Sequence, residues 1–523
     1  MNHVDAKIVT LDKCVEKQWD FVIAGSGIGG GATAYALTKK GFRVLMLEKG
    51  CFNLLSGDVS QEQESPNERI KHGKWPYQIK SIIDDSESHI WPPLGCGVGG
   101  TSQLYAAALQ RFEAVDFKQT CRDGKALLWP FGYSDIEPYY QQAEALFSVS
   151  GTKNPLSPDE SYDLNDPQAM SEVDGCFFQM FREKGLNPYR LHVGIDYKDQ
   201  CFECGGKVCL KDCKKNSYNS CIKPAMNTGN LWLATECEVS TVSANAKSAE
   251  SLDVVQNGKL FRIHSKNIIL SCGAYMSPVI LRRSKNKNWP NGIGNDHDLV
   301  GRNLMFHVSD FIAIWSGSKK SKSGARKTIA IRDFYQHGDL KLGELQSSGL
   351  DADYGNILYS LIMKFEQSKF SKIKLFKQLL RIPAYLGSKL FGGATVFATI
   401  LEDFPYKENR VVDCKEEKSG FFVEYSIHDE LKHRLKYMRE KIRHSVGVKR
   451  SMVLSSGVPL NFGHPCGTCR MGSDPSSSVL DEDCRVHGLN NLYVLDASFM
   501  PTSGGTNPSL TIAANALRVA SKL

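Results

Sequence analysis

The segment from Asp20 to Gly50 constrains the fold of this chain more than any other part of the sequence. Its first apolar run, Phe21 to Ala24, is too short for a helix and suits a buried parallel strand. A glycine-rich turn follows, then an alanine-rich segment from Ala32 to Lys40 and a second apolar run from Arg43 to Leu47. This order of strand, turn, helix and strand predicts a βαβ unit.

The turn reads GSGIGG and fits the G-x-G-x-x-G pattern of a dinucleotide-binding loop. Gly25 permits the tight turn, Gly27 lets the backbone approach a pyrophosphate, and Gly30 lets the helix pack closely on the strand. The helix start offers free N–H groups to the diphosphate, with Ser26 beside them. Glu48, about twenty residues on, stands where a carboxylate accepts hydrogen bonds from ribose hydroxyls. We therefore expect this unit to bind a dinucleotide.

Length and composition exclude several classes of protein. A chain of 523 residues exceeds one simple core, so two joined domains are expected. The formal charge of +7 is modest, and the basic stretches lie in no recognisable nucleic-acid module, so nucleic acid is not an expected partner. No secretory h-region or membrane-length apolar run is present, and 16 cysteines without a secretion signal favour reduced thiols. The expected location is the cytoplasm.

A second glycine-rich stretch follows at residues 92–112. It contains a run of small residues, namely Gly97, Gly99, Gly100, Thr101 and Ser102. A bare backbone next to hydroxyl groups suits the close approach of a flat, polar ring system. An ordinary glycine-rich loop explains the same residues, and the sequence at this point leaves both interpretations open.

Four cysteines, Cys201, Cys204, Cys209 and Cys213, lie close together in the middle of the chain. Such a cluster could ligate zinc or an iron–sulfur cluster. Its spacing matches neither pattern well, and no second pair of ligands follows. We therefore expect a metal-free, thiol-rich loop.

The remaining patterns predict regular elements between these motifs. Strands are expected at Trp232–Val242 and Phe261–Ser271, and helices at Ser134–Phe147, from Ser277 or Pro278 onward, and at Ile427–His444.

The segment from Phe365 to Leu390 also predicts a helix, with a basic flank and Pro383 ending or kinking it. Its apolar stripe comprises Phe370, Ile373, Phe376, Leu380 and Tyr385. We expect this stripe to face the core; contact with a membrane surface is the less favoured alternative.

The C-terminal part of the sequence holds the candidate catalytic residues. His464 is expected in a loop beside glycines, and an apolar strand ends at Asp496. Asn507 and Pro508 are expected to cap and open the last helix, whose N-terminus favours negative charge. A lone histidine is more often structural, and an asparagine before proline is usually only a cap. The functional interpretation therefore requires His464 and Asn507 to meet at one cofactor.

Together these motifs resemble the glucose–methanol–choline (GMC) oxidoreductases, a family of FAD-dependent alcohol oxidases and dehydrogenases. The resemblance covers nearly the whole chain, through GSGIGG with Glu48, GVGGTS at 97–102, WPFGYSDIEPYY at 129–140, LSCGAYMSP at 270–278, VGRNLMFH at 300–307, EDFPYKENRV at 402–411, HPCGTCRMG and LYVLDASFMPTSGGTNPSLTIAANA. It implies an α/β fold in which a Rossmann-type FAD-binding domain is interleaved with a mixed-sheet α+β substrate domain. The implied FAD-binding domain comprises residues 1–115, 225–307 and 455–523, and the implied substrate-binding domain comprises residues 116–224 and 308–454.

The resemblance also implies roles for single residues. His464 matches the active-site base and Asn507 its partner, a His/Asn pair as in cholesterol oxidase-like and pyranose oxidase-like members. Asp496 matches an acid that helps hold FAD, and Val239 matches a residue whose backbone contacts adenine. Pro508 matches the start of the helix whose end lies at the flavin.

Two positions depart from the pattern of the family. Leu104 stands where pyranose oxidases carry the histidine that binds flavin covalently, so non-covalent FAD is implied. Tyr105 stands where many members have an asparagine.

The implied reaction is oxidation of a primary or secondary alcohol, in a sugar, amino sugar or other small hydroxylated molecule, by hydride transfer to flavin N5. His464 accepts the hydroxyl proton, for which an imidazole near its neutral pKa is suited. O2 or another acceptor reoxidises the flavin.

Three alternatives remain open. An NAD-dependent dehydrogenase leaves the C-terminal motifs unexplained, and a hydroxynitrile lyase-type enzyme shares the fold without net redox chemistry. A binding protein with structural FAD is least favoured, because His464 and Asn507 are both present.

Overall fold

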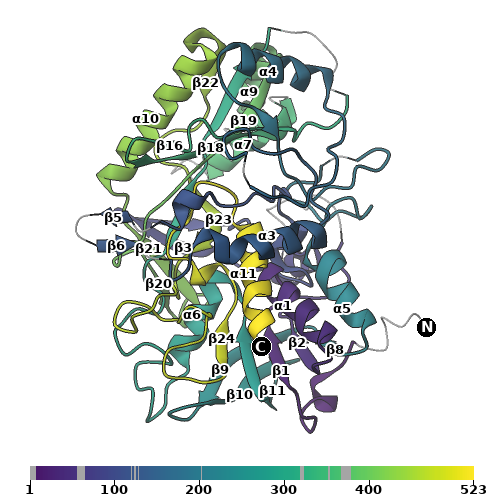
Figure 1. Ribbon diagram of the computed structural model, residues 1–523, viewed down its shortest axis with the longest axis vertical. Helices are drawn as coiled ribbons and strands as arrows, with labels where there is room; N and C mark the ends of the chain where they lie inside the picture. Colours follow the sequence, from purple (N-terminus) through teal and green to yellow (C-terminus); the bar gives the residue numbers. More distant parts are fainter. Residues whose placement is uncertain are drawn as a thin grey trace.

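A parallel sheet forms the centre of the lower half of the molecule (Figure 1). The computed structural model describes residues 8–55, 65–118, 120–122, 125–127, 129–158, 160–201, 203–317, 323–351, 354–366 and 378–523. The sheet has the strand order β24-β12-β1-β2-β8, formed by Leu492–Val494, Asn267–Leu270, Phe21–Ala24, Val44–Leu47 and Leu231–Ala234. Nearly all of these residues are buried, which explains the uninterrupted apolar runs in the sequence.

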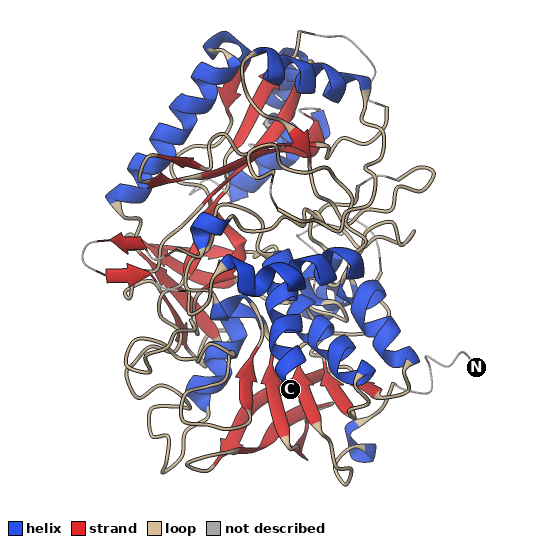
Figure 2. Ribbon diagram, viewed as in Figure 1, coloured by secondary structure: helices blue, strands red, loops and turns tan. Residues whose placement is uncertain are grey.

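Helices cover one face of this sheet (Figure 2). α1 (Ile28–Lys39) begins directly after the glycine-rich turn and packs against α11 (Ser509–Lys522), which in turn packs against α3 (Tyr133–Leu146). Strands from the beginning, middle and end of the chain therefore share one core with helices of equally distant origin. The predicted βαβ unit is present, with its helix starting four residues earlier than expected, at Ile28.

Two expected strands are each divided in the structure. Trp232–Val242 belongs to β8 and to β9 (Cys237–Ala244), separated by a turn in which Glu236 has φ +57°. Phe261–Ser271 belongs to β11 (Lys259–His264) and β12. At both breaks the chain passes between the parallel sheet and an antiparallel one, ordered β11-β10-β9 with β10 at Ala249–Gln256. Neither turn contains glycine or proline, so the sequence carried no strong signal for it.

The helix expected from Ser277 or Pro278 begins earlier, as α6 (Gly273–Arg283). Pro278 lies inside this helix and cannot donate to the carbonyl of Ala274. The hydroxyl of Thr468 donates to that carbonyl instead, at 2.6 Å. The lost helical hydrogen bond is therefore replaced from a distant segment.

An antiparallel sheet occupies the upper half of the molecule, with order β22-β14-β19-β18-β15-β7. Its strands are Ser451–Val453, Phe311–Trp315, Ala394–Leu401, Gly343–Asp351, Ile329–Ile331 and Tyr189–Arg190. β13 (Met305–Val308) pairs with the last residue of β19, Val308 with Leu401, and also pairs with β23 (Leu460–Cys466).

The two faces of this upper sheet have different neighbours. Phe397 of β19 and Leu345 of β18 share a hydrophobic cluster with residues of α4 (Glu172–Glu183) and α10 (Asp429–Val446). On the other face, Ala330 of β15 packs with Ala107, which belongs to the second glycine-rich stretch. The sheet thus lies over the loops at the carboxyl ends of the parallel strands. The expected domain boundaries stay predictions.

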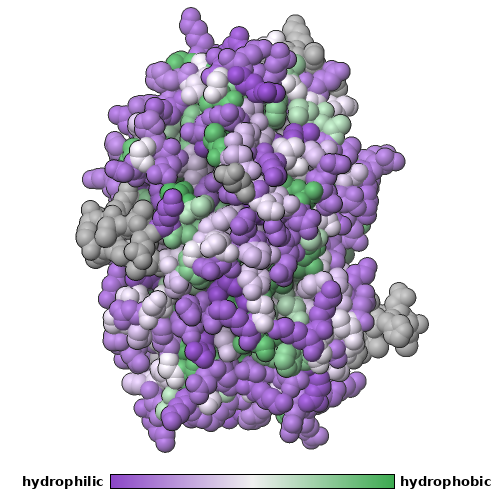
Figure 3. All heavy atoms as spheres, viewed as in Figure 1, coloured by the Kyte–Doolittle hydropathy of each residue, from purple (hydrophilic) through white to green (hydrophobic). Residues whose placement is uncertain are grey.

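The surface seen in Figure 3 is mostly hydrophilic, with apolar residues scattered over it. α9 (Arg381–Phe391) departs from expectation, because Tyr385 is 55% exposed and only Ala384 is buried among its described side chains. The expectation of a core-facing stripe is therefore wrong for α9, while Phe370, Ile373 and Phe376 lie outside the described residues. Among the helices that the structure describes, none combines the length and apolar character of a membrane span.

Candidate functional site

The glycine-rich turn between β1 and α1 is shaped by close backbone contacts. A Cβ added at Gly25, where φ is +99°, would lie 2.2 Å from the carbonyl oxygen of Ser271. A Cβ at Gly30 would lie 2.1 Å from the carbonyl oxygen of Gly25. At Gly27 an added Cβ would meet no atom within 4 Å, so this backbone faces open space at the start of α1. That arrangement fits a diphosphate, which needs close backbone approach and free N–H groups.

Ser26 connects this turn to Glu48 and to the second glycine-rich stretch. Its hydroxyl donates to Glu48 Oε2 at 2.5 Å and accepts from the N–H of Gly99 at 3.0 Å. The N–H of Gly50 donates to Glu48 Oε1 at 2.8 Å. Burial raises the pKa of Glu48, and these hydrogen bonds oppose that shift. Glu48 is thus held rigidly at the end of β2, with Gly97 also within reach of Ser26.

The second glycine-rich stretch lies directly against the first. A Cβ added at Gly100 would be 2.9 Å from Cα of Gly27. The Thr101 hydroxyl accepts from the N–H of Gly95 at 3.1 Å, and the Ser102 hydroxyl donates to the Gly99 carbonyl at 2.5 Å. Both hydroxyls therefore stabilise the loop, and contact of its backbone with a ring system stays a prediction.

The other expected cofactor residues border the same region. Val239 lies in β9, two residues beyond Cys237, whose N–H donates to the carbonyl of Glu48 at 2.9 Å. The Asp496 carboxylate accepts from Gly273 N, Ser277 Oγ, Ser498 N and Ser498 Oγ at 2.5–2.9 Å. Burial raises the pKa of Asp496 against these bonds. Its carboxylate thus fixes the start of α6 relative to the loop after β24.

The sequence predicted that His464 lies in a loop. In the structure it lies in β23, which pairs with β13. Its Nδ1 is 3.1 Å from Nδ1 of His307, and the two rings meet edge to face. His307 is fully buried, and its Nε2 lies 3.1 and 3.0 Å from the carbonyl oxygens of Ser503 and Gly504.

These contacts determine which nitrogen of His464 is free. Carbonyl oxygens only accept hydrogen bonds, so His307 carries its proton on Nε2. A neutral His307 then has a lone pair on Nδ1 and must accept a hydrogen bond from Nδ1–H of His464. Nε2 of His464 is left with its lone pair and can act as a base.

Removal from water keeps both rings neutral, although His464 retains partial solvent access. This desolvation lowers the pKa of His464 to about 3, with a further contribution from His307, and lowers the pKa of His307 to about 4. At neutral pH His464 is therefore unprotonated and available to accept a proton. The expectation of a pKa near the ordinary histidine value is corrected by this burial.

Asn507 does not cap the last helix in the expected way. α11 begins at Ser509, with Pro508 at the cap position. Oδ1 of Asn507 is buried and has no hydrogen-bond partner among the described residues. Asn507 follows the 503–504 segment that His307 contacts, so His307 links the strand of His464 to the segment leading to Asn507.

Leu104 and Tyr105 continue from the second glycine-rich stretch. Leu104 is buried and offers no group for covalent attachment of a flavin. The hydroxyl of Tyr105 donates to the carbonyl of Lys215 at 2.5 Å, and burial raises its pKa. Tyr105 therefore has a structural partner on the cysteine-rich side of the molecule.

The four cysteines of the cluster are free thiols, and Cys201 neighbours Cys213 while Cys204 neighbours Cys209. Burial raises the pKa of Cys201 to about 11 and also raises that of Cys204. Within the described ranges, no three His, Cys, Asp or Glu side chains are arranged to hold a metal ion. A metal-free loop stays a prediction, which iron and zinc analysis of the purified protein can test.

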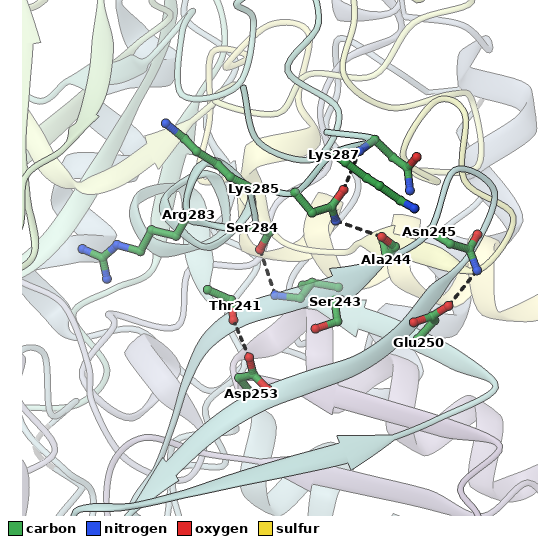
Figure 4. Close-up of a pocket in the computed structure, with 13 residues that line it drawn as sticks. Thr241, Ser243, Ala244, Asn245, Glu250, Asp253, Arg283, Ser284, Lys285 and Lys287 are labelled. Carbon is green, nitrogen blue, oxygen red and sulfur yellow. Dashed lines mark hydrogen bonds between the residues drawn. The ribbon is translucent and has the colours of Figure 1, made fainter. Parts of the chain in front are cut away.

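A separate cavity of about 420 Å³ lies between β9 and the end of α6 (Figure 4). Its polar groups pair with one another: Asn245 donates to Glu250 at 2.8 Å, and Thr241 donates to Asp253 at 3.0 Å. None of the expected site residues lines this cavity. It is distinct from the region of His464.

Two profiles described as GMC oxidoreductase match residues 13–309 and 448–516, which together span more than half of the chain. The chain belongs to the GMC oxidoreductase family. This is a family of flavoproteins, and the chain is accordingly an oxidoreductase acting on hydroxyl groups.

Known relatives extend over nearly the whole chain. It is 27% identical to 6'''-hydroxyparomomycin C oxidase of Streptomyces lividus, over 96% of this chain and 91% of the relative. It is also 27% identical to paromamine 6'-oxidase of Streptomyces fradiae, over 97% of this chain and 91% of that relative. The fold matches the crystal structure of pyridoxine 4-oxidase from Mesorbium loti with a TM-score of 0.63 and 18% identity, covering 96% of this chain and 99% of that chain. The expected fold class is thereby confirmed.

His307 is a candidate site residue that was not predicted from the sequence. It ends the VGRNLMFH segment, so a signal was present in the motif itself. Its partner is 157 residues away in the chain, and only the pairing of β13 with β23 brings the two rings together.

Proposed function

We propose that this protein oxidises a primary or secondary alcohol of a small hydroxylated molecule to the carbonyl, with non-covalent FAD as oxidant and His464 as base. The observation that carries this proposal is the His307–His464 contact, which leaves Nε2 of His464 unprotonated. FAD, when bound, supplies the acceptor for the two electrons and the hydrogen of the carbinol carbon. His464 Nε2 takes the hydroxyl proton, and Asn507 orients the alcohol oxygen.

Several residues would hold the FAD. The open backbone at Gly27 and the start of α1 suit the diphosphate, and Glu48 lies at the strand end that suits the ribose. Leu104 supports non-covalent attachment, because a leucine side chain cannot form a bond to flavin. The N-terminus of α11, behind Pro508, would stabilise negative charge on the reduced ring.

The class of substrate is narrowed by the relatives. Two of them are named as oxidases of paromomycin-type compounds, which supports an amino sugar over a sterol or a long-chain alcohol. We propose a polar amino sugar or sugar alcohol as substrate and O2 or another acceptor as the oxidant of the reduced flavin.

Anaerobic mixing with a panel of alcohols tests the proposal. We expect paromamine or a related sugar to bleach the flavin absorbance, and air to restore it if O2 is the acceptor. A hydroxynitrile lyase-type enzyme would release cyanide from a cyanohydrin without bleaching. Reduction of added NAD without any change in flavin absorbance would favour the nicotinamide alternative instead.

Replacement of Glu48 by alanine should weaken FAD retention. The carboxylate anchors Ser26 and Gly50, and it would accept from the ribose, so about 1.5–3 kcal/mol of binding should be lost. The measurement is the amount of FAD released on dialysis. In a separate measurement, complete release of FAD from denatured wild-type protein would verify non-covalent attachment. Glu424→Ala, on a distant strand, is the control. An unchanged FAD affinity in Glu48→Ala would exclude Glu48 as a ribose ligand.

The exposed face of α9 supports a second, peripheral role. Ile382, Leu386 and Leu390 are 60–69% exposed, with Tyr385 and the basic Arg381 on the same helix. An apolar stripe with basic neighbours suits the interface of an anionic lipid bilayer. We propose that α9 contacts such a surface. We also propose a cytoplasmic location, which the high content of unpaired cysteines supports.

Sedimentation with lipid vesicles tests the contact of α9. Wild-type protein should sediment with anionic vesicles at low salt and less with neutral ones. Replacing Ile382 and Leu386 by serine should abolish sedimentation. Replacing the equally exposed Leu210 and Leu260 by serine should not. Equal sedimentation of both double variants would assign the binding to general surface charge.

A further inference from the structure

A group of buried oxygens near Asn507 lacks hydrogen-bond partners. Among the described residues, Glu344 Oε1, Gln346 Oε1, Thr506 Oγ1 and Asn507 Oδ1 are buried and unpartnered. Buried polar atoms are almost always paired in folded proteins, so a cluster of unpaired ones requires an explanation. Three of the four atoms, in the ionised carboxylate and the two amides, can only accept hydrogen bonds, and the fourth, the Thr506 hydroxyl, can accept or donate. A ligand that satisfies them must be rich in donors.

The four residues come from two segments in direct contact. The N–H of Glu344, at the start of β18, donates to the carbonyl of Gly505 at 3.1 Å. Glu344 and Gln346 are two residues apart on one strand and so share a face of the sheet. Burial raises the pKa of Glu344, and the charge of Arg332 and the neighbouring Thr506 hydroxyl oppose that shift. Thr506 Oγ1 and Glu344 Oε1 are thus neighbours that do not complete a hydrogen bond with each other. Glu344, Thr506 and Asn507 therefore lie together at the 505–507 segment, and Gln346 lies on the same face of β18 as Glu344.

Around Glu344 the carboxyl groups outnumber the cations. Arg332 forms ion pairs with both Glu113 and Glu344, so two carboxylates share one guanidinium. The other buried cations of this network have carboxylates of their own, Arg111 with Glu144 and Lys341 with Asp116. Glu344 Oε2 accepts hydrogen bonds from Gln110 at 2.6 Å and from Arg332 at 3.2 Å. Neither of these donors bonds to Oε1.

We infer that Glu344 and Gln346 recognise an ammonium group on the alcohol substrate, placing its hydroxyl beside His464 and Asn507. An ammonium ion has three N–H donors and no acceptor, which complements the unpaired oxygens, and its charge balances the second carboxylate. This inference deepens the proposed function and rests on it. It identifies the substrate class as amino-bearing alcohols and makes Glu344 a determinant of specificity.

The test compares paromamine with its fully N-acetylated derivative in FAD-loaded protein. Dissociation constants are measured anaerobically from the change of the flavin spectrum on mixing, and reduction rates are measured separately. Wild-type protein should bind paromamine at least tenfold more tightly than the acetylated form. Glu344→Gln should weaken paromamine binding about 10–100-fold and leave the acetylated form within about threefold. Glu424→Gln, which removes a carboxylate paired with Arg410 on another sheet, should change neither.

A second variant keeps the test decisive if Glu344→Gln does not fold. Gln346→Leu removes one acceptor without altering charge, and it should weaken paromamine binding about threefold to tenfold. Equal affinity of wild-type protein for both compounds, or unchanged discrimination in both variants, would overturn the ammonium site. If neutral alcohols bleach the flavin under those conditions, the proposed oxidation still stands. If paromamine binding depends on Glu344 but no alcohol bleaches the flavin, the ammonium site stands and the proposed oxidation fails.

Discussion

Replacement of His464 by alanine is expected to slow flavin reduction about 10²–10⁴-fold while FAD stays bound. That range is usual for the loss of a general base. His464 contacts none of the residues proposed to hold the diphosphate or ribose, so cofactor content should not change. Rapid-mixing measurements of flavin bleaching, with bound FAD determined on the same samples, check both statements. His444→Ala, an exposed histidine on α10, is the matched control.

The pH dependence of wild-type protein gives an independent readout of His464. Burial and the neighbouring His307 lower its pKa to about 3, so the neutral, proton-accepting form dominates at every higher pH. Flavin reduction should therefore stay constant from about pH 8 to pH 5 and fall only as the pH approaches the lowered pKa. A sharp loss of rate near pH 6.5 would show that His464 titrates as an ordinary, well-solvated histidine. Wild-type rates in His464→Ala would refute the base assignment itself.

Local patterns were sufficient for the parts of the fold whose causes are local. β1 coincides with the expected Phe21–Ala24, because a short apolar run and the adjoining glycines define the strand and its end. The break between β8 and β9 was missed, since the turn at Glu236 contains no glycine or proline and depends on pairing with strands distant in sequence. Periodicity likewise predicted an amphipathic α9 without showing which side contacts the core.

The candidate site was likewise predictable from the sequence only in part. The motifs named His464 and Asn507 and the two glycine-rich stretches, because each motif is continuous in the chain. They could not show that Asn507 leaves its Oδ1 unpaired, or that Glu344 approaches Gly505, because these are contacts between segments more than 150 residues apart. The burial that lowers the pKa of His464 is also a property of the packed structure alone.

His307 provides the second test with a large expected effect. Nε2–H of His307 is fixed by the carbonyls of Ser503 and Gly504, and its Nδ1 accepts from Nδ1–H of His464. His307→Leu removes this acceptor, so His464 is free to carry its proton on Nε2, the nitrogen that must be unprotonated. In the Ser-His-Asp triad the wrong histidine tautomer costs about 10⁴-fold. We expect flavin reduction to slow about 10²-fold in His307→Leu, because His464 can still adopt the tautomer that carries its proton on Nδ1.

The loss should appear in the limiting rate of flavin reduction and not in KM, since His307 is a positioning residue that acts through His464. His307→Asn places an amide oxygen where Nδ1 accepts, so it should recover reduction to within about tenfold of wild type. A merely structural role would predict the opposite order, because leucine replaces the ring volume better than asparagine does in a fully buried site. Equal rates in the leucine variant and the wild type would mean that the tautomer of His464 is fixed without His307.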